Sequence, residues 1–116
     1  MTVKVKNFTD LKRKLGAGIP FEIMDHGIKP QYNGQKRVVQ KIQTNGMYTG
    51  IYGDPDDELS KCNYGKGSWI AFENAHCFEF LADGTIRQYT EKYCHTDAEK
   101  RDGRYIWTIR LFEQED

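Results

Sequence analysis

The chain lacks an excess of charge, a long apolar run and a cysteine framework. Its 17 basic and 17 acidic side chains cancel, so net charge does not draw it to nucleic acid or to an anionic membrane. The sequence contains no run of about 18 apolar residues, which a membrane-spanning helix would require. The opening MTVKVKNF lacks the apolar segment of a secretion signal. Three cysteines without framework spacing are typical of a reducing compartment. We therefore expect a cytoplasmic protein with one domain, residues 1–116.

The sequence also lacks the local signatures of catalytic and ion-binding loops. Gly65-Lys66-Gly67-Ser68 ends like a phosphate-binding loop, but Ser60 stands where that motif requires glycine. The acidic stretch Asp54 to Glu58 alternates like calcium ligands without the glycine and terminal glutamate of a calcium loop. Neither a nucleophile elbow nor a zinc-protease helix is present. We expect no enzyme activity and no cofactor.

The strongest structural signal is the dipeptide Asp83-Gly84 between the strand-like runs 76–82 and 85–90. Asp-Gly favours a two-residue type I′ turn, because that turn needs a positive φ at both central positions. Such a turn predicts Phe80 opposite Arg87 and His76 opposite Glu91. A further strand is expected over 68–72, so this hairpin forms the centre of a β-rich domain.

A second hairpin is expected over 35–44 and 47–52, joined by Asn45-Gly46. A two-residue turn there pairs Gln43 with Tyr48 and Val39 with Tyr52. One face of this hairpin is apolar and predicts core residues: Val38, Ile42, Met47 and Ile51. The opposite face mixes cations and aromatics: Arg37, Val39, Lys41, Gln43, Tyr48 and Tyr52.

Hydrophobic spacing predicts the remaining elements. Phe8, Leu11 and Leu15 mark a short helix that Gly16 ends, and strands are expected over 21–24 and 105–112. The short helix needs a sheet to pack on, because isolated helices below about 12 residues are marginal in water. The fold class is therefore α+β, with a short N-terminal helix packed on a strongly bent antiparallel sheet or a small SH3-like barrel of about six strands.

Two groups of residues are candidates for binding a partner. Cations interleaved with aromatics on a sheet face are able to stack bases or anchor a protein, and they also occur on ordinary half-buried sheets. This group comprises Arg37, Lys41, Tyr48, Tyr52, Lys66 and Trp69. The second group is the acidic loop, with Asp54, Asp56, Asp57 and Glu58.

The best candidate for a metal site combines thiolates with an imidazole, the ligand mixture of structural zinc. The set is Cys62, Cys77, Cys94 and His95. Adjacent strand residues such as His76 and Cys77 point to opposite faces, so they do not ligate one ion together, and the spacing matches no zinc module. Free buried cysteines are the alternative interpretation, and a zinc-dependent hydrolase or nuclease is a further functional alternative.

The order of several segments resembles small accessory proteins of bacterial phages and integrative elements. The segments are Phe8-Thr9-Asp10-Leu11-Lys12 before Gly16, the run Arg37 to Gly46, Gly67-Ser68-Trp69-Ile70, and Phe78-Glu79-Phe80 followed by Asp83-Gly84-Thr85-Ile86. The resemblance covers about residues 7 to 90. Some such proteins are anti-CRISPR inhibitors, so it implies binding to a Cas9 effector or its guide RNA complex and a block to DNA or guide loading.

The resemblance carries over no inhibitory residue, and the even charge departs from the strongly acidic inhibitors that mimic DNA. Only the acidic stretches Asp54 to Glu58 and Glu113 to Asp116 match that type. We therefore expect a non-enzymatic protein of the bacterial host cytoplasm that binds a host protein, most sharply Cas9. The alternative is a small nucleic-acid-binding barrel, and no membrane partner is expected.

Overall fold

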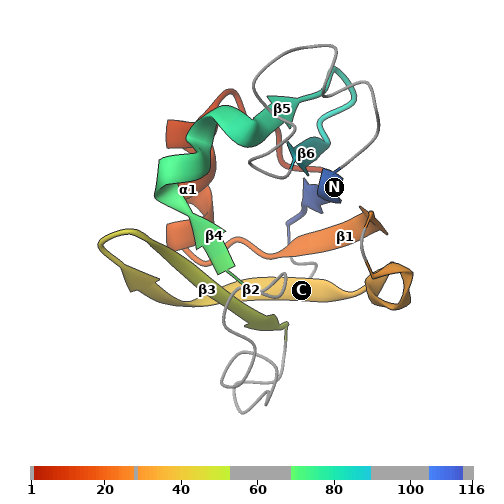
Figure 1. Ribbon diagram of the computed structural model, residues 1–116, viewed down its shortest axis with the longest axis horizontal. Helices are drawn as coiled ribbons and strands as arrows, with labels where there is room; N and C mark the ends of the chain where they lie inside the picture. The colour runs from red at the N-terminus through yellow and green to blue at the C-terminus, as the bar shows by residue number, and fades with distance from the viewer. Residues whose placement is uncertain (1, 28, 53–68, 90–104, 114–116) are drawn as a thin grey trace.

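One helix packs into a curled, seven-stranded antiparallel sheet in the computed structural model, which describes residues 2–27, 29–52, 69–89 and 105–113 (Figure 1). The strands are β1 (Phe21–His26), β2 (Lys36–Gln43), β3 (Gly46–Ile51), β4 (Trp69–Ala71), β5 (Phe78–Phe80), β6 (Ile86–Tyr89) and β7 (Tyr105–Leu111). The described residues also form the short 3-10 helices η1 (Pro30–Tyr32) and η2 (Phe72–Cys77). The predicted α+β class with a strongly bent sheet is confirmed.

The strands follow the order β4-β3-β2-β1-β7-β6-β5, so β4 and β5 are the edges of the sheet. The sheet is thus a half-barrel with seven strands, rather than the closed SH3-like barrel of about six strands that was the other expectation. Between the two edges runs η2, and the helix α1 (Phe8–Gly16) lies beside it (Figure 1). Their contact is aromatic, since the rings of Phe8 and Phe72 lie 6.4 Å apart, edge to face.

The helix α1 buries the predicted apolar stripe and ends where the sequence places its end. Leu11 and Leu15 have no exposed surface, and Gly16 is the last helical residue. The residue that leaves the helix through a left-handed conformation is Gly18, with φ of 94°. The N–H groups of Gly18 and Ile19 donate to carbonyls of the last turn at 3.1 and 3.2 Å, which is the Schellman arrangement.

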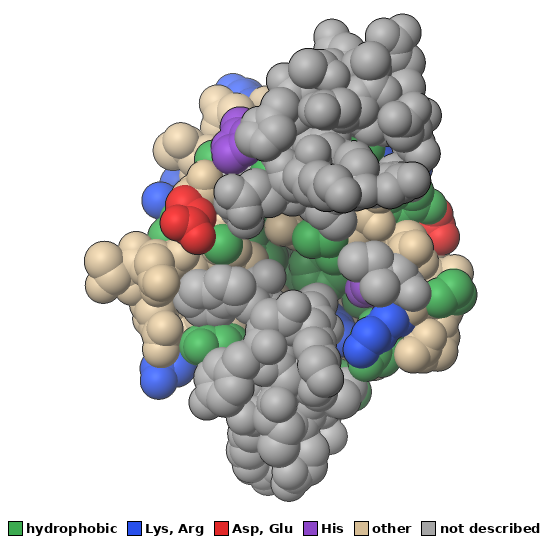
Figure 2. All heavy atoms as spheres, in the orientation of Figure 1, with side chains coloured by type: hydrophobic (Ala, Val, Ile, Leu, Met, Phe, Trp, Pro, Cys, Tyr) green, Lys and Arg blue, Asp and Glu red, His purple; other side chains and the backbone are tan. Residues whose placement is uncertain are grey.

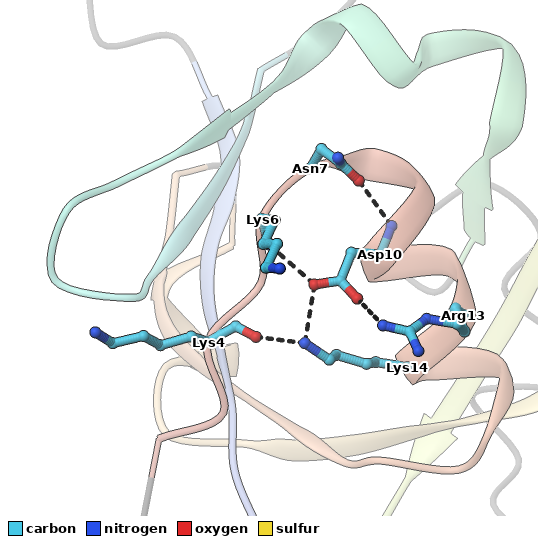
Figure 3. A network of polar contacts seen from close by, with 6 residues as sticks. All are labelled: Lys4, Lys6, Asn7, Asp10, Arg13 and Lys14. Carbon is cyan, nitrogen blue, oxygen red and sulfur yellow. Dashed lines mark hydrogen bonds and ion pairs between the residues drawn. The ribbon is translucent and has the colours of Figure 1, made fainter.

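A charge network joins α1 to the N-terminal segment (Figure 3). Its members are Lys4, Lys6, Asn7, Asp10, Arg13 and Lys14. Asn7 caps the helix by accepting the Asp10 N–H at 2.9 Å. Lys14 donates both to the Asp10 carboxylate at 2.8 Å and to the Lys4 carbonyl at 2.6 Å. The Lys14 ammonium, the Lys6 N–H and the Arg13 guanidinium hold the pKa of Asp10 well below its ordinary value.

The hairpin of β2 and β3 forms, but its turn lies one residue earlier than predicted. Gln43 pairs with Gly46 and Ile42 with Met47, so Thr44 and Asn45 make the turn and the predicted pairing of Gln43 with Tyr48 is wrong. No described residue other than glycine has a positive φ, so Asn45 does not adopt the type I′ conformation. The observed register buries Met47 to 1% exposure, and burial of one face outweighs a local turn preference.

A β-bulge at Gln40 exchanges the two faces of β2. The register shifts between Val39 and Lys41, and an extra residue on one strand reverses the alternation beyond it. Arg37 therefore points to the concave face with Met47, and its exposure is only 2%. The prediction that Arg37 shares a face with Lys41 is wrong, and Val39 likewise packs against the core.

The apolar set that was predicted for the core of this hairpin is correspondingly divided. Met47 is buried as expected, whereas Ile42 is 55% exposed at the far end of β2. Val38 pairs with Gly50 in the register and belongs to the outer face with Lys41. Ile51 keeps the predicted side and is half-buried. The bulge thus accounts for the displacement of Val38, whereas Ile42 pairs with Met47 and keeps its predicted face.

The hairpin of β5 and β6 uses a three-residue loop instead of the predicted two-residue turn. Gly84 has φ of 90°, and Asp83 accepts the Thr85 N–H at 3.0 Å, which is a turn followed by a glycine bulge. Phe80 consequently pairs with Ile86 rather than with Arg87. The predicted strand 76–82 begins inside the 3-10 helix η2, which ends at Cys77. His76 is therefore not in a strand, so its predicted cross-strand pairing is wrong. The predicted partner, Glu91, lies outside the described residues.

One hydrophobic core fills the concave side of the half-barrel. Its buried members come from α1 and six of the strands: Leu11, Leu15, Phe21, Ile23, Met47, Ile70, Phe78, Ile86, Trp107, Ile109 and Leu111. In the space-filling view, hydrophobic side chains line a hollow at the centre of the visible face (Figure 2). The alternation in β7 sends Trp107, Ile109 and Leu111 inward and leaves Arg110 and Phe112 for the outer face.

Candidate functional site

The outer face of β2 and β3 keeps most of the predicted cation and aromatic positions together. We call it the β2–β3 outer face and define it by Lys36, Val38, Lys41, Tyr48 and Tyr52. The register pairs Lys41 with Tyr48 and Tyr48 with Trp69 of β4. Three predicted binding positions therefore form one row across adjacent strands. Lys41 is exposed and Tyr48 is half-buried.

The second row of this face gains an aromatic residue from the end of the chain. The rings of Tyr52 and Phe112 lie 6.0 Å apart, edge to face, and Lys36 Nζ lies 5.4 Å from the centre of the Phe112 ring. The Tyr52 N–H donates to the Lys36 carbonyl at 2.9 Å. Sequence reasoning placed Phe112 in a strand but not in the site. Its alternation with the inward-facing Leu111 is the signal that could have indicated its side.

Arg37 lies instead among buried polar groups on the concave face. We call this group the inner polar cluster and define it by His26, Tyr32, Arg37, Gln88 and Trp107. The Arg37 guanidinium carbon lies 5.2 Å from the Tyr32 ring and 5.9 Å from the Trp107 ring. His26 lies 5.5 Å from Tyr32 and 6.0 Å from Trp107, each edge to face. All but Tyr32 are less than 5% exposed.

Hydrogen bonds fix the orientation of the two basic groups in this cluster. Arg37 Nε donates to Gln35 Oε1 at 2.7 Å, and Arg37 Nη1 lies 3.4 Å from Thr49 Oγ1. The Lys29 N–H donates to His26 Nδ1 at 2.9 Å, which assigns the imidazole proton to Nε2. Burial lowers the pKa of His26, and the nearby Arg37 and Lys29 charges lower it further. The His26 imidazole is therefore neutral at pH 7.

A second polar network covers the outer face of β1, β7 and β6. The Tyr105 hydroxyl donates to the Asp25 carboxylate, and the Arg87 guanidinium lies 4.3 Å from the centre of the Tyr105 ring. Arg87 Nε also donates to Thr108 Oγ1 at 2.9 Å. The hydrogen bond to Asp25, together with burial, raises the pKa of the Tyr105 hydroxyl. These contacts join three strands, and each of the polar side chains in them already has a partner within the protein. The network therefore has a structural role.

Several predicted site residues lie outside the described residues. They are Asp54, Asp56, Asp57, Glu58 and Lys66 of the binding candidates, and Cys62, Cys94 and His95 of the metal candidates. Their roles stay predictions. For Trp69 the structure gives the backbone position in β4.

Cys77 is the one metal candidate that the described residues include. It is completely buried and disulfide-bonded, so its sulfur offers no thiolate to a metal in this form. The expectation of a free buried thiol is therefore wrong for Cys77. Within residues 2–27, 29–52, 69–89 and 105–113, no group of three or more His, Cys, Asp or Glu side chains is arranged to hold a metal ion.

Comparisons with known proteins add no assignment. A scan of protein-family models and searches of curated proteins and of solved structures found no match to this chain. Among the described residues, no helix has the length and apolarity that crossing a membrane requires.

Proposed function

We propose that this chain is a non-enzymatic binding protein that engages its partner through the β2–β3 outer face. The observation that carries the proposal is the row formed by Lys41, Tyr48 and the backbone position of Trp69 in adjacent strands. Arg37 and Val39 point inward, and strict alternation would point Lys41 inward as well. The bulge at Gln40 reverses the alternation, so Lys41 points outward and joins the row. Bulges often redirect a side chain at a functional surface.

A protein partner fits the composition of this face. Tyrosine and tryptophan supply large contact area with few rotatable bonds, and they dominate the binding energy of many interfaces. Tyr48 and Tyr52 are already half-buried in the free protein, and Tyr52 packs on Phe112. Side chains that are ordered before binding lose less conformational entropy when the complex forms.

Charge indicates what kind of protein surface is complementary. Between Asp25 and Asp54 the sequence contains no acidic residue and four basic ones, Lys29, Lys36, Arg37 and Lys41. Lys36 and Lys41 are exposed on the outer face. Such a face favours an acidic or mixed-charge partner surface and speeds association at low salt.

Inhibition of a bacterial host complex is the sharpest form of the proposal. Its support is the resemblance of residues 7 to 90 to small proteins of phages and mobile elements, some of which inhibit Cas9. In this form the β2–β3 outer face binds an acidic or mixed-charge surface of the Cas9 effector, and the bound chain blocks DNA or guide loading. The protein then acts in the cytoplasm of the bacterial host, where thiol reductants would open the Cys77 disulfide.

Nucleic acid is the second candidate partner for the same face. Lysines next to tyrosines favour it, because bases stack on aromatic rings while cations contact phosphates. The dependence of affinity on salt separates the two candidates. Phosphate contacts release counterions and make affinity fall steeply with salt concentration, whereas an interface dominated by aromatic burial responds weakly.

The test is a pull-down of the full tagged chain from bacterial lysate, with and without nuclease. A double variant, Lys41→Glu with Tyr48→Ala, removes the row, and Lys4→Glu is the matched charge-reversal control on the N-terminal segment, where the Lys4 ammonium points away from the Asp10 network (Figure 3). We expect one protein partner that resists nuclease, that Lys4→Glu retains and that the double variant loses. Equal capture by both variants, or recovery of nucleic acid alone, contradicts the proposal of a protein partner.

A further inference from the structure

The inner polar cluster contains two buried polar atoms that make no hydrogen bond. They are the indole nitrogen Nε1 of Trp107 and the amide oxygen Oε1 of Gln88. Trp107 has no exposed surface and Gln88 only 4%. Buried polar groups are nearly always paired, because an unmade hydrogen bond leaves the cost of desolvation uncompensated. Two such atoms on neighbouring residues therefore call for an explanation.

The register places the two residues side by side. Trp107 of β7 pairs with Gln88 of β6 on one side and with His26 of β1 on the other. The three residues form a polar row across the concave face, which is otherwise filled by aliphatic and aromatic side chains. Tyr32 and Arg37 approach this row from η1 and β2. Five elements thus direct polar groups toward one place.

The chemistry of this row favours a negatively charged group. The Trp107 indole is a donor only. The Arg37 guanidinium carbon lies 5.9 Å from the Trp107 ring, and a buried guanidinium gives the site positive potential. Gln88 is able to present either its oxygen or its NH₂ group to a ligand, since rotation of the amide exchanges them. Donors with a cation nearby match a carboxylate or phosphate oxygen.

We propose that the inner polar cluster binds the carboxylate or phosphate group of a small molecule. Trp107 Nε1 donates a hydrogen bond to an oxygen of that group, the Gln88 amide contacts a second polar atom of the same ligand, and Arg37 supplies charge. The aliphatic and aromatic side chains around the cluster suit this role, because ligand sites are mostly apolar and completed by a few convergent polar groups. The site is independent of the β2–β3 outer face and of any protein partner.

The test uses the full chain without a partner and two probes, sodium acetate and sodium phosphate, each against sodium chloride at equal ionic strength. Bound ligand stabilises the folded state, so for a dissociation constant of about 1 mM we expect thermal unfolding about 10 °C higher at about 100 mM probe. The chain has two tryptophans. In ¹H–¹⁵N spectra, the Trp107 indole signal should shift saturably, while the Trp69 indole is the internal reference.

Two variants complete the design. Trp107→Phe keeps an aromatic ring and removes the donor, so the saturable rise in unfolding temperature should disappear, while Trp69→Phe should retain it. A response to acetate alone identifies a carboxylate ligand, and a response to phosphate alone identifies a phosphate ligand. No saturable response to either probe, as expected if water alone fills the site, overturns the proposal, and so does an undiminished response in Trp107→Phe. If Trp107→Phe fails to fold, the indole titration of the unaltered chain decides.

Discussion

Two glycines at the end of α1 should respond oppositely to the same substitution. Gly18 has φ of 94° and no neighbouring atom within 4 Å of an added Cβ, so Gly18→Ala changes only the backbone energy. A non-glycine residue in the left-handed region costs about 1–2 kcal/mol. Gly16 is helical, and alanine there is favoured over glycine by up to about 1 kcal/mol. Its added Cβ would lie 3.3 Å from Ile42 Cδ1, the end of a side chain that is 55% exposed and free to move.

Thermal and denaturant unfolding, each followed by tryptophan fluorescence, measure both substitutions. For a chain of 116 residues, 1 kcal/mol corresponds to about 4 °C in the thermal midpoint. We expect Gly18→Ala to lower that midpoint by about 4–8 °C and Gly16→Ala to raise it by up to about 4 °C, with an unchanged denaturant slope. A neutral Gly18→Ala together with a destabilising Gly16→Ala would refute the assignment of Gly18 as the left-handed residue and of Gly16 as the last helical residue.

Three further predictions concern close packing and charge. An added Cβ at Gly27 would lie 2.2 Å from the Tyr105 carbonyl oxygen, so Gly27→Ala should destabilise by about 3 kcal/mol in urea unfolding; an effect below about 1 kcal/mol argues against this close contact of Gly27 with β7. Asp10→Asn should lower stability at pH 7, because the folded state depresses the pKa of Asp10. That contribution is complete above the ordinary pKa of 3.8 and decreases progressively as pH falls below it, so the difference between the urea midpoints of Asp10→Asn and the unaltered chain should narrow steadily with falling pH; a difference that does not change with pH contradicts the charge network. The folded state also depresses the pKa of His26, so the unfolded chain binds the proton more readily and stability should fall as pH drops below 6.5. His26→Gln should weaken that pH dependence in the same assay, and an unchanged slope would mean that other groups cause it.

The sequence predicted the elements that depend on periodicity. The spacing of Phe8, Leu11 and Leu15 found α1, and alternation found most strands, because burial of one face imposes those periods. The two hairpins were also found, but both registers were wrong. The predicted type I′ turns assumed φ above zero at Asp83 and Asn45, whereas only Gly18, Gly34 and Gly84 have such values among the described residues. Tertiary burial selected other turns.

The candidate site shows the same limit at a single residue. No local signal marks Gln40 as a bulge, yet that bulge decides which side of the sheet each neighbour faces. It moved Arg37 into the core and left Lys41 and Tyr48 outside, so the predicted binding group divided into an outer face and an inner polar cluster. His26, Gln88 and Trp107 come from three strands, and their proximity depends on sheet order, which periodicity does not give.

The most direct test of the β2–β3 outer face is the affinity of the captured partner for matched single variants. Isothermal titration should be run with the unaltered chain, Tyr48→Ala, Lys41→Glu and Lys4→Glu at two salt concentrations. Removal of a central aromatic anchor typically costs at least about 2 kcal/mol, so Tyr48→Ala should weaken binding about thirtyfold, Lys41→Glu should weaken it most at low salt, and Lys4→Glu should leave it unchanged. Equal affinities for Tyr48→Ala and the unaltered chain would contradict the assignment of this face.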